Sequence, residues 1–459
     1  MIFNHLLEFP DRIALFEDGK EITYSEMINA ADTLVENIPS RSVVLMRFEN
    51  NYKSILAYVG FLRKKIVTLI VNPQLDREHI EDICSRFQPN YIFSLKEQFG
   101  DELVQSSEGS IYKTSHAAIP PTDDDLAILL TTSGSTGSPK FVRLSYKNLL
   151  ANTKSICEYL GINKEERGIT CLPLYYSFGL SLLNTHLYAG ASIVVTDQSY
   201  MSPLFWNQFI QQRVTTFSGV PYTFSILRRL GLENVNLSNV HYVTQAGGKL
   251  GKEDVEYWID FFSQRGISFV VMYGQTEATA RMSYLPPAHA RANSASIGIA
   301  IPGGEFYLCD GEKKILNSFE EGELVYRGDN VSLGYAESVS DLCNGDDNKG
   351  ELFTGDIAYC DDKGYYFIVG RKKRFLKLFG NRTNLDEIER MLKNNGIENL
   401  CSGKDDNLRI YILNNSLKEK VNELIRTKTL INPTAYTIVV LDKFPISDSG
   451  KVLYSNLPY

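Results

Sequence analysis

A loop of small hydroxylated residues and glycines that ends in a lysine has the composition of a polyphosphate-binding site. The apolar run from Leu126 to Leu130 predicts a short buried strand, and it leads directly into Thr131-Thr132-Ser133-Gly134-Ser135-Thr136-Gly137-Ser138-Pro139-Lys140. Glycines let backbone N–H groups approach an anion, hydroxyl groups donate to phosphate oxygens, and Lys140 supplies a positive charge. A flexible linker has a similar composition, but the strand before the loop argues against one. The loop is not a Walker motif, because Pro139 precedes the lysine and no Ser or Thr follows it.

The loop resembles the phosphate loop of the adenylate-forming superfamily, which includes acyl-CoA synthetases, adenylation domains of peptide synthetases and firefly luciferase. In that family the loop holds the ATP phosphates while a carboxylate attacks the α-phosphate. One departure is Phe141, which stands where the family usually has glycine and removes no phosphate ligand. The resemblance implies that the nucleotide phosphates are bound by Thr131, Thr132, Ser133, Gly134, Ser135, Thr136 and Lys140.

A second motif, Tyr273-Gly274-Gln275-Thr276-Glu277-Ala278, is nearly identical to a string that family members carry at this point. Alone, the string could be any loop with a helix behind it. The resemblance implies that Tyr273 stacks on adenine, Thr276 binds the α-phosphate and Glu277 holds Mg²⁺. These types suit the tasks, because a purine needs an aromatic face, an oxygen gaining charge needs a donor, and a hard cation needs a carboxylate.

Two shorter motifs extend the implied nucleotide site. Gly247 and Gly248 resemble the segment whose backbone passes beside adenine, although a Gly-Gly turn is also ordinary. Asp356 stands where the family's aspartate accepts both ribose hydroxyls, and its two oxygens suit a vicinal diol. The stretches 322–328 and Gly334-Tyr335 match a structural segment of the family, to which we assign no catalytic part.

The basic run Gly370-Arg371-Lys372-Lys373-Arg374 marks the expected domain boundary, although such a run can also be a solvated linker. The resemblance implies that Arg371 reaches the ribose and that Lys373 is the hinge of a rotating C-terminal domain. We therefore expect an N-terminal adenylation domain over residues 1–370 and a mobile C-terminal lid over residues 371–459. Leu385 stands where the family commonly has proline, which weakens the correspondence for the thioester-forming half.

Lys451 lies in the closing segment Phe444-Pro445-Ile446-Ser447-Asp448-Ser449-Gly450-Lys451-Val452. A lysine on such a loop is ordinarily unremarkable surface. The resemblance implies that it swings over the nucleotide and bridges the carboxylate to the α-phosphate, because a long, compact cation can neutralise the charge that develops there. The implied catalytic set is Lys451, Thr276 and Glu277.

The whole chain has the rhythm of a layered α/β protein. Helical patterns alternate with short β-rich runs from Arg12 to Phe87 and again from Ser192 to Met272. Loops after such strands should converge on one cleft. With the resemblance, we expect an α/β fold with a large N-terminal domain of layered sheets flanked by helices, a small β-rich subdomain, and a small mobile α+β C-terminal domain.

Composition narrows the class of protein. A chain of 459 residues exceeds what one hydrophobic core usually supports, and a net charge of −8 makes nucleic-acid binding a poor default. The seven cysteines lack a CxxC pair, which suits reduced thiols. The N-terminus lacks a secretion signal and no apolar run could span a bilayer. We expect a soluble cytoplasmic protein without nucleic-acid or membrane partners.

The implied reaction needs ATP and Mg²⁺. A carboxylate attacks the α-phosphorus, pyrophosphate leaves, and the acyl group passes to the thiol of CoA or of carrier-protein phosphopantetheine. The acyl pocket should draw on Tyr176, Ser177, Phe178 and Gly219. The aromatic residues among them, Tyr176 and Phe178, favour an apolar or aromatic acid, or a polar acid bound through tyrosine hydroxyls, unless these rings simply belong to the hydrophobic core.

Two alternatives stay open. An amino-acid-activating ligase would load a separate carrier protein, but relatives of that kind usually place an aspartate near Tyr176 to hold the ammonium group. A catalytically silent, nucleotide-binding relative would have lost Lys451, Glu277 or Asp356, and all three are present. The sequence leaves open which acid is used, which thiol accepts it and the oligomeric state.

Overall fold

The computed structural model describes residues 2–95, 102–106, 109–131, 140–378, 381–429, 431–446 and 452–458, without the side chains of residues 102–106, 109, 373, 377, 381 and 382. The described residues divide into two compact units. The larger one holds those of 2–305 and 326–352, and the smaller one holds those of 306–325 and 353–458. The boundary that we predicted at residue 370 stays a prediction.

An eight-stranded sheet forms the centre of the larger unit, in the order β20-β9-β8-β4-β3-β5-β7-β6. The strands β3, β4, β5 and β8 run parallel, and β3 and β4 are buried throughout, as expected for strands covered on both faces. The strands are β3 (Val43–Arg47), β4 (Val67–Val71), β5 (Tyr91–Phe93), β6 (Glu102–Ser106), β7 (Gly109–Lys113), β8 (Leu126–Thr131), β9 (Phe141–Ser145) and β20 (Gly334–Ala336).

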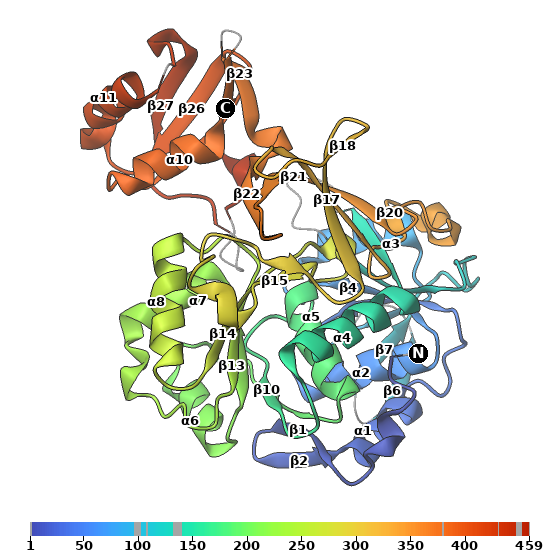
Figure 1. The fold of residues 1–459 in the computed structure, drawn as a ribbon. Helices are drawn as coiled ribbons and strands as arrows, with labels where there is room; N and C mark the ends of the chain where they lie inside the picture. Colours follow the sequence, from blue (N-terminus) through green and yellow to red (C-terminus); the bar gives the residue numbers. More distant parts are fainter. Residues whose placement is uncertain are drawn as a thin grey trace. The chain divides into compact units, whose positions relative to one another are not determined.

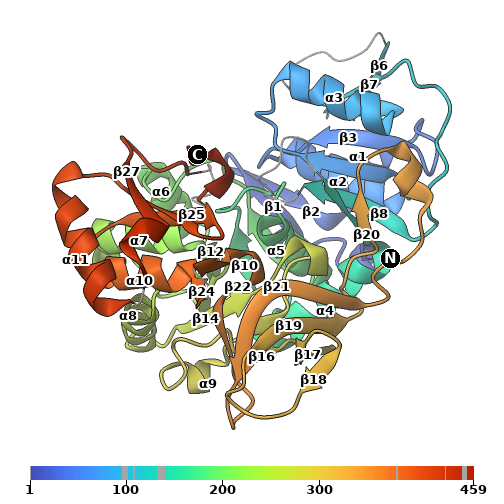
Figure 2. The same cartoon turned by 90° about the horizontal axis from the view of Figure 1, so that it is seen from above.

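Helices cover both faces of this sheet. Val44 and Met46 of β3 pack in the same cluster as residues of α1 (Tyr24–Leu34), α2 (Tyr52–Arg63), α4 (Tyr146–Leu160) and α5 (Ser177–Tyr188). Val43 and Leu45, which alternate with them, pack with α3 (Arg77–Phe87). Figure 2 shows α3 on the opposite side of β3 from α1 and α2. This layering confirms the α/β class predicted from the alternating patterns.

A second, five-stranded sheet has the order β12-β13-β14-β15-β16. An aromatic cluster that includes Phe217, Trp258 and Phe269 joins it to its helices. The elements are β12 (Thr216–Gly219), β13 (Tyr242–Gln245), β14 (Ser268–Tyr273), β15 (Ser283–Tyr284), β16 (Ile299–Ala300), α6 (Pro203–Gln211), α7 (Pro221–Leu230), α8 (Lys252–Ser263) and α9 (Pro287–Ala290).

A third sheet has the order β10-β11-β1-β2. Its hairpin turns at Asp18-Gly19, whose φ angles are 49° and 79°, as a tight right-twisted hairpin requires. An Asp-Gly dipeptide between two strand-like runs is a typical sequence signal for such a hairpin. The strands are β1 (Ile13–Glu17), β2 (Lys20–Thr23), β10 (Arg167–Ile169) and β11 (Ser192–Val194).

The smaller unit is an α+β assembly. Figure 1 shows α10 and α11 beside its three-stranded sheet β25-β26-β27, and Ile388, Leu392 and Val421 form the core between them. The smaller unit also contains the hairpin β23-β24 and strands of the sheet β18-β17-β19-β21-β22. The elements are β17 (Gly304–Asp310), β18 (Lys313–Ile315), β19 (Gly322–Gly328), β21 (Glu351–Cys360), β22 (Tyr366–Arg371), β23 (Phe375–Leu378), β24 (Asn381–Asn384), β25 (Asn399–Lys404), β26 (Asn407–Ile412), β27 (Tyr436–Val440), α10 (Leu385–Asn394) and α11 (Lys418–Lys428).

One helix is shorter than its sequence pattern predicts. The sequence pattern from Tyr24 runs to Ile38, but α1 ends at Leu34, and the carbonyl oxygen of the next residue, Val35, accepts from Nζ of Lys64 at 2.8 Å. All seven cysteines are described and each is a free thiol. No helix in the described ranges is both long and apolar enough to cross a bilayer.

Candidate active site

The phosphate-loop candidates begin at the end of β8 and resume at the start of β9. The two strands pair antiparallel with Thr131 opposite Phe141, so a buried strand pair holds the two ends of the loop side by side. Thr131 is half-buried and Lys140 is exposed. The remaining candidates lie outside the described residues and stay predictions: Thr132, Ser133, Gly134, Ser135 and Thr136.

The segment 334–337, which consists of strand β20 and the residue after it, provides partners to two of the predicted site residues. Nζ of Lys140 lies 2.6 Å from Oε1 of Glu337, and the hydroxyl of Tyr335 in β20 donates to Oε1 of Glu277 at 2.8 Å. Burial, together with the charge of Glu277, raises the pKa of Tyr335, so the phenol stays protonated and donates. Nothing in the sequence indicated that Glu337 belongs to the site, and Tyr335 was assigned no catalytic part, because the pairing of β20 with the distant β9 brings both residues there.

Arg143 holds the segment 334–337 in place through hydrogen bonds. Its side chain is fully buried in β9, and its guanidinium donates to the carbonyl oxygens of Leu333 and Tyr335 at 2.9 and 3.1 Å. It also pairs with Asp347 at 2.5 Å. A buried guanidinium with these partners is well compensated, so Arg143 ties the sheet edge to the positions of Tyr335 and Glu337.

Thr276 lies beside the start of α5. Its Oγ1 is 3.3 Å from Oγ of Ser177, and it opens the 3₁₀ turn η3 (Thr276–Ala278) directly after β14. An added Cβ at Gly179 would lie 2.2 Å from the carbonyl oxygen of Pro173, so only glycine allows α5 to begin this close to the preceding segment. The structure thus brings a predicted α-phosphate ligand into contact with a predicted acyl-pocket residue.

A strained turn follows Glu277. Thr279 has φ 68° and ψ −57°, and the N–H of Ala280 donates to the carbonyl of Ala278 at 2.8 Å. This is a γ-turn of positive φ, which is rare and strained for a β-branched residue. Oγ1 of Thr279 donates to the carbonyl of Asn330 at 2.7 Å, and Nδ2 of Asn330 donates to Ala278 at 2.9 Å. Strain that is held in this way clusters at functional sites.

Gly247 connects the predicted adenine segment to the predicted acyl pocket. Its φ is 79°, and an added Cβ would lie 3.0 Å from Cγ1 of Val220 and 4.0 Å from Cδ1 of Phe178. At Gly248 an added Cβ would lie 3.1 Å from Cγ of Pro221. Side chains are therefore disfavoured at both glycines, as the expected close approach of the backbone requires.

Two acyl-pocket candidates also serve the core. The ring of Tyr176 lies 4.4 Å from that of Tyr175 and packs against the main apolar cluster. An added Cβ at Gly219 would lie 2.8 Å from the ring of Phe224 in α7, so packing alone requires glycine there. Tyr273, at the end of β14, is half-buried, and Gln275 donates to its hydroxyl at 3.3 Å.

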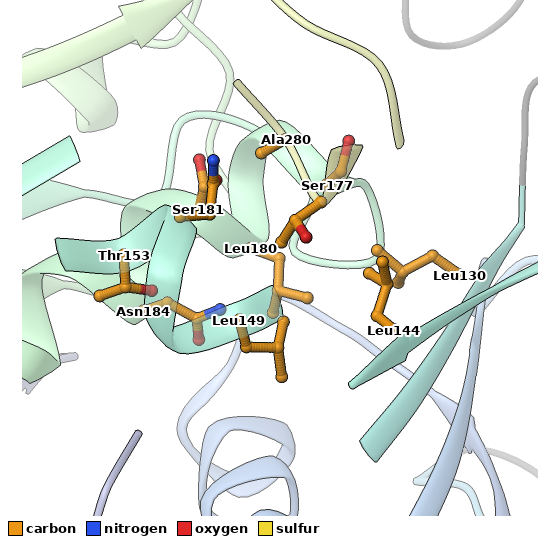
Figure 3. A pocket seen from close by; sticks show the side chains of 11 residues that line it. Leu130, Leu144, Leu149, Thr153, Ser177, Leu180, Ser181, Asn184 and Ala280 are labelled. Atoms are coloured by element: carbon orange, nitrogen blue, oxygen red, sulfur yellow. The ribbon is translucent and has the colours of Figure 1, made fainter. Parts of the chain in front are cut away.

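A small cavity lies at the meeting point of β8, α4 and α5. Its volume is about 10 Å³, which is room for one water molecule. Figure 3 shows Leu130, Ser177 and Ala280 around it. The buried Oδ1 of Asn152, on the same lining, has no hydrogen-bond partner in the described ranges, so the cavity suits a bound water rather than an organic substrate.

The predicted ribose ligands meet in the smaller unit. Asp356 and Arg371 stand opposite each other in the antiparallel pair β21-β22, and Nε of Arg371 lies 3.2 Å from Oδ1 of Asp356. Asp356 is buried and Arg371 is exposed. The aspartate is thus paired with a cation, and the ribose roles of both residues stay predictions.

A partly buried ionic cluster follows the predicted hinge. The guanidinium of Arg374 pairs with Asp386 and Glu389 of α10 and lies 4.1 Å from the ring centre of Tyr454. The hydroxyl of Tyr454 donates to Glu389 at 2.9 Å. The cluster ties the segment after Lys373 to the chain's last residues. The side chain of Lys373 itself is outside the described part.

Lys451 also lies outside the described residues, but its flanks are defined. Ile446 and Val452 form an antiparallel bridge, and the N–H of Leu453 donates to the carbonyl of Pro445 at 2.9 Å. Lys451 lies between these paired residues in the sequence, and its part in catalysis stays a prediction.

Glu277 fits a magnesium ion that arrives with ATP. No group of three or more His, Cys, Asp or Glu side chains could form a metal cage in the described ranges. Mg²⁺ is commonly held by one or two carboxylates, with substrate phosphates and water completing its shell. A single, well-oriented carboxylate beside Thr276 suits that mode of binding.

Comparison with known proteins agrees with the predicted fold and class of protein. The AMP-binding enzyme family profile matches residues 2–336. A 2-succinylbenzoate–CoA ligase of Bacillus cytotoxicus is 24% identical over 83% of this chain and 80% of its own length. An oxalate–CoA ligase of Arabidopsis thaliana is 25% identical over 85% and 82%.

Solved structures extend the likeness to nearly the whole chain. The O-succinylbenzoate coenzyme A synthetase of Bacillus subtilis in complex with AMP superimposes with a TM-score of 0.80 at 20% identity, covering 99% of this chain and 98% of that one. Its complex with an acyl-adenylate intermediate gives a TM-score of 0.78 at 19% identity, covering 99% and 97%. The chain belongs to the AMP-binding enzyme family.

Proposed function

We propose that the chain is an AMP-forming acid–thiol ligase that activates a small carboxylic acid as an acyl-adenylate and then passes the acyl group to CoA. The observation that carries this proposal is the contact between Thr276 and Ser177. This contact places the hydroxyl of Thr276, which suits an α-phosphate oxygen, beside the first residue of α5. We expect α5 to border the acid. Family membership and the CoA ligases among the relatives support the same reaction.

In the first half-reaction, a carboxylate oxygen of the acid attacks the α-phosphorus and the bond to pyrophosphate breaks. Lys140 and the loop before it stabilise the departing pyrophosphate, and Thr276 donates to an α-phosphate oxygen. Glu277 holds the magnesium ion that neutralises phosphate charge. Catalysis then depends on positioning and electrostatics, with no covalent nucleophile from the protein.

The smaller unit completes the proposal. Asp356 and Arg371 bind the ribose, and Lys451 bridges the acid to the α-phosphate. A lid over residues 371–459 then turns about Lys373, and the thiol attacks the acyl carbon with release of AMP. The ion pair of Asp356 with Arg371 supports the ribose role.

CoA is the acceptor we favour, because the relatives are named as CoA ligases. A separate carrier protein that bears phosphopantetheine is the alternative acceptor. The need for MgATP and CoA supports a cytoplasmic location for this reaction.

Acid-dependent exchange of labelled pyrophosphate into ATP tests the proposal. The panel holds aryl, fatty, hydroxy, dicarboxylic and amino acids, and the acceptor is tested by mass spectrometry of the CoA product. Exchange with one class of acid, lost in Lys451→Ala and kept in Lys443→Ala, is expected. ATP binding without exchange for any acid would instead favour the silent, nucleotide-binding relative.

A further inference from the structure

Arg281 is a buried cation without an acidic partner. Its side chain is 3% exposed, and no carboxylate in the described part of the chain forms an ion pair with it. Its Nη1 atom lies 3.3 Å from the hydroxyl of Tyr159 and 3.3 Å from Sδ of Met272. Its Nε atom is buried and donates to no acceptor among the described residues. All of the contacts that hold the guanidinium are neutral.

Such an arrangement is costly, because a buried charge is normally paired or saturated with strong acceptors. The same unit shows the ordinary solution at Arg143, which is equally buried but binds Asp347 and several carbonyl oxygens. Arg281 has a phenol, a thioether and the face of Phe178, whose ring centre is 5.1 Å from the guanidinium carbon. The missing partner is an anion.

The backbone directs Arg281 into this position. Arg281 follows the strained γ-turn at Thr279 by two residues, and its own carbonyl accepts from Nδ2 of Asn152 at 2.8 Å. An added Cβ at Gly274 would lie 2.7 Å from Cα of Arg281, so glycine in the motif lets the two segments close up. Backbone strain that the surrounding contacts maintain is typical of functional sites. The strained turn therefore indicates that the position of Arg281 serves a function.

The location is the predicted acyl pocket. Phe178, which carries the guanidinium on its face, also lies within 4.0 Å of the Cβ position of Gly247. Met272 is the penultimate residue of β14, immediately before Tyr273. Its unbranched side chain can shift to admit a ligand. Arg281 therefore stands behind the residues expected to border the acid.

We infer that Arg281 binds a second anionic group on the acyl substrate, so that the acid is dicarboxylic or carries an equivalent distal anion. The inference rests on the proposed function. The planar guanidinium would pair with the distal carboxylate through two parallel hydrogen bonds, including the unused Nε–H. The other carboxylate would remain at the α-phosphate to react.

The test compares each diacid with its own monomethyl ester, which keeps the reacting carboxylate and loses the distal charge. Malonic, succinic, glutaric, adipic and phthalic acids and their monoesters are assayed by pyrophosphate exchange with the full chain. For at least one pair, we expect kcat/KM for the diacid to exceed that for the monoester by about 100-fold. This measurement needs no variant and so does not depend on whether a substitution is tolerated.

Variants then assign the preference to Arg281. Arg281→Met keeps the packing volume and should lower kcat/KM for the diacid by about 100-fold while affecting the monoester far less. Arg281→Lys keeps the charge and should retain part of the preference. Arg228→Met is the matched control, because Arg228 also covers an aromatic ring, Tyr257 at 4.2 Å, but on the surface, and the preference should be unchanged.

Equal activation of diacids and monoesters, or a diacid preference that survives in Arg281→Met, would overturn the inference and leave the proposed function intact. Exchange with none of the acids, including those of the wider panel, would overturn the proposed function and the inference together. The two failures are therefore distinct.

Discussion

Tyr335 donates its phenolic hydrogen to Oε1 of Glu277 across 2.8 Å. The carboxylate proposed for magnesium is thus oriented by a residue of an edge strand that is distant in sequence. Residues that orient a metal ligand commonly change metal affinity by 10- to 100-fold when removed.

Tyr335→Phe should therefore raise the magnesium concentration that gives half-maximal pyrophosphate exchange by about tenfold. The reason is that Glu277 loses the donor that holds its carboxylate. Tyr436→Phe is the control, because that hydroxyl donates to Asn422 in the smaller unit. An unchanged magnesium dependence in Tyr335→Phe would remove Glu277 or Tyr335 from the metal site.

Glu337→Gln should lower KM for MgATP by up to about fivefold. Lys140 pairs with Glu337 at 2.6 Å, and an exposed ion pair of this kind is worth about 0.2–1 kcal/mol, which a phosphate must overcome. Asp329→Asn breaks a comparable exposed pair with Lys147 and should leave KM unchanged. A rise in KM in Glu337→Gln would mean that the glutamate helps to place Lys140 instead of competing with ATP.

Gly274→Ala should lower kcat/KM for adenylation by about 100-fold or more. The new Cβ would lie 1.9 Å from the carbonyl oxygen of Ala280, so the backbone of residues 279–281 must move, and misplacement of this order near reacting groups is severe. Gly345→Ala, where nothing lies within 4 Å of the new atom, should be neutral. Wild-type kinetics in Gly274→Ala would show that this turn does not position the site.

His186 should make stability depend on pH between about 4 and 6.5. Burial lowers the pKa of this fully enclosed imidazole to about 4. Below pH 6.5 the unfolded chain takes up a proton that the folded chain refuses, so the free energy of unfolding falls by about 3 kcal/mol as the pH drops to 4. Urea unfolding of His186→Gln should lack this part of the decline.

His79 provides the opposite sign as a control. A hydrogen bond to Asp76 raises the pKa of His79, so its contribution is present at low pH and is lost as the pH rises through its folded-state pKa. His79→Gln should therefore leave the decline below pH 6.5 in place. If His186→Gln and the parent chain had parallel profiles, the buried imidazole would not be the titrating group.

Arg374→Met should loosen the smaller unit by about 1–3 kcal/mol, because it removes the cation that the mostly buried Glu389 contacts at 2.7 Å. Hydrogen exchange of peptides from residues 385–458, followed by mass spectrometry, should show faster exchange there and no change in the larger unit. Arg390→Met, an exposed neighbour on α10, is the control. Unchanged exchange in Arg374→Met would show that the cluster with Tyr454 does not hold the chain's end.

Local chemistry in the sequence was sufficient for much of the fold and for the order of the site motifs. Strands such as β3 and β4 are continuous apolar runs, and helices such as α3 and α4 carry a cap and an apolar stripe, so their periodicity alone predicts them. The phosphate-loop strand, Thr276 and Glu277 were predicted because their residue types and chain neighbours are characteristic. The family profile, which matches residues 2–336, agrees with the class of protein that these motifs predicted.

The tertiary structure decided which groups are paired and which are not. Tyr335 and Glu337 reach the site because β20 pairs with β9. The pairing of an edge strand with a distant segment does not change the hydrophobic periodicity of either segment, so the sequence does not predict it. Arg281 looked like any charged residue after a motif. Its burial without an anion appeared only once the γ-turn, Phe178 and Met272 enclosed it, because the cost of a buried charge is set by its surroundings and not by its sequence neighbours.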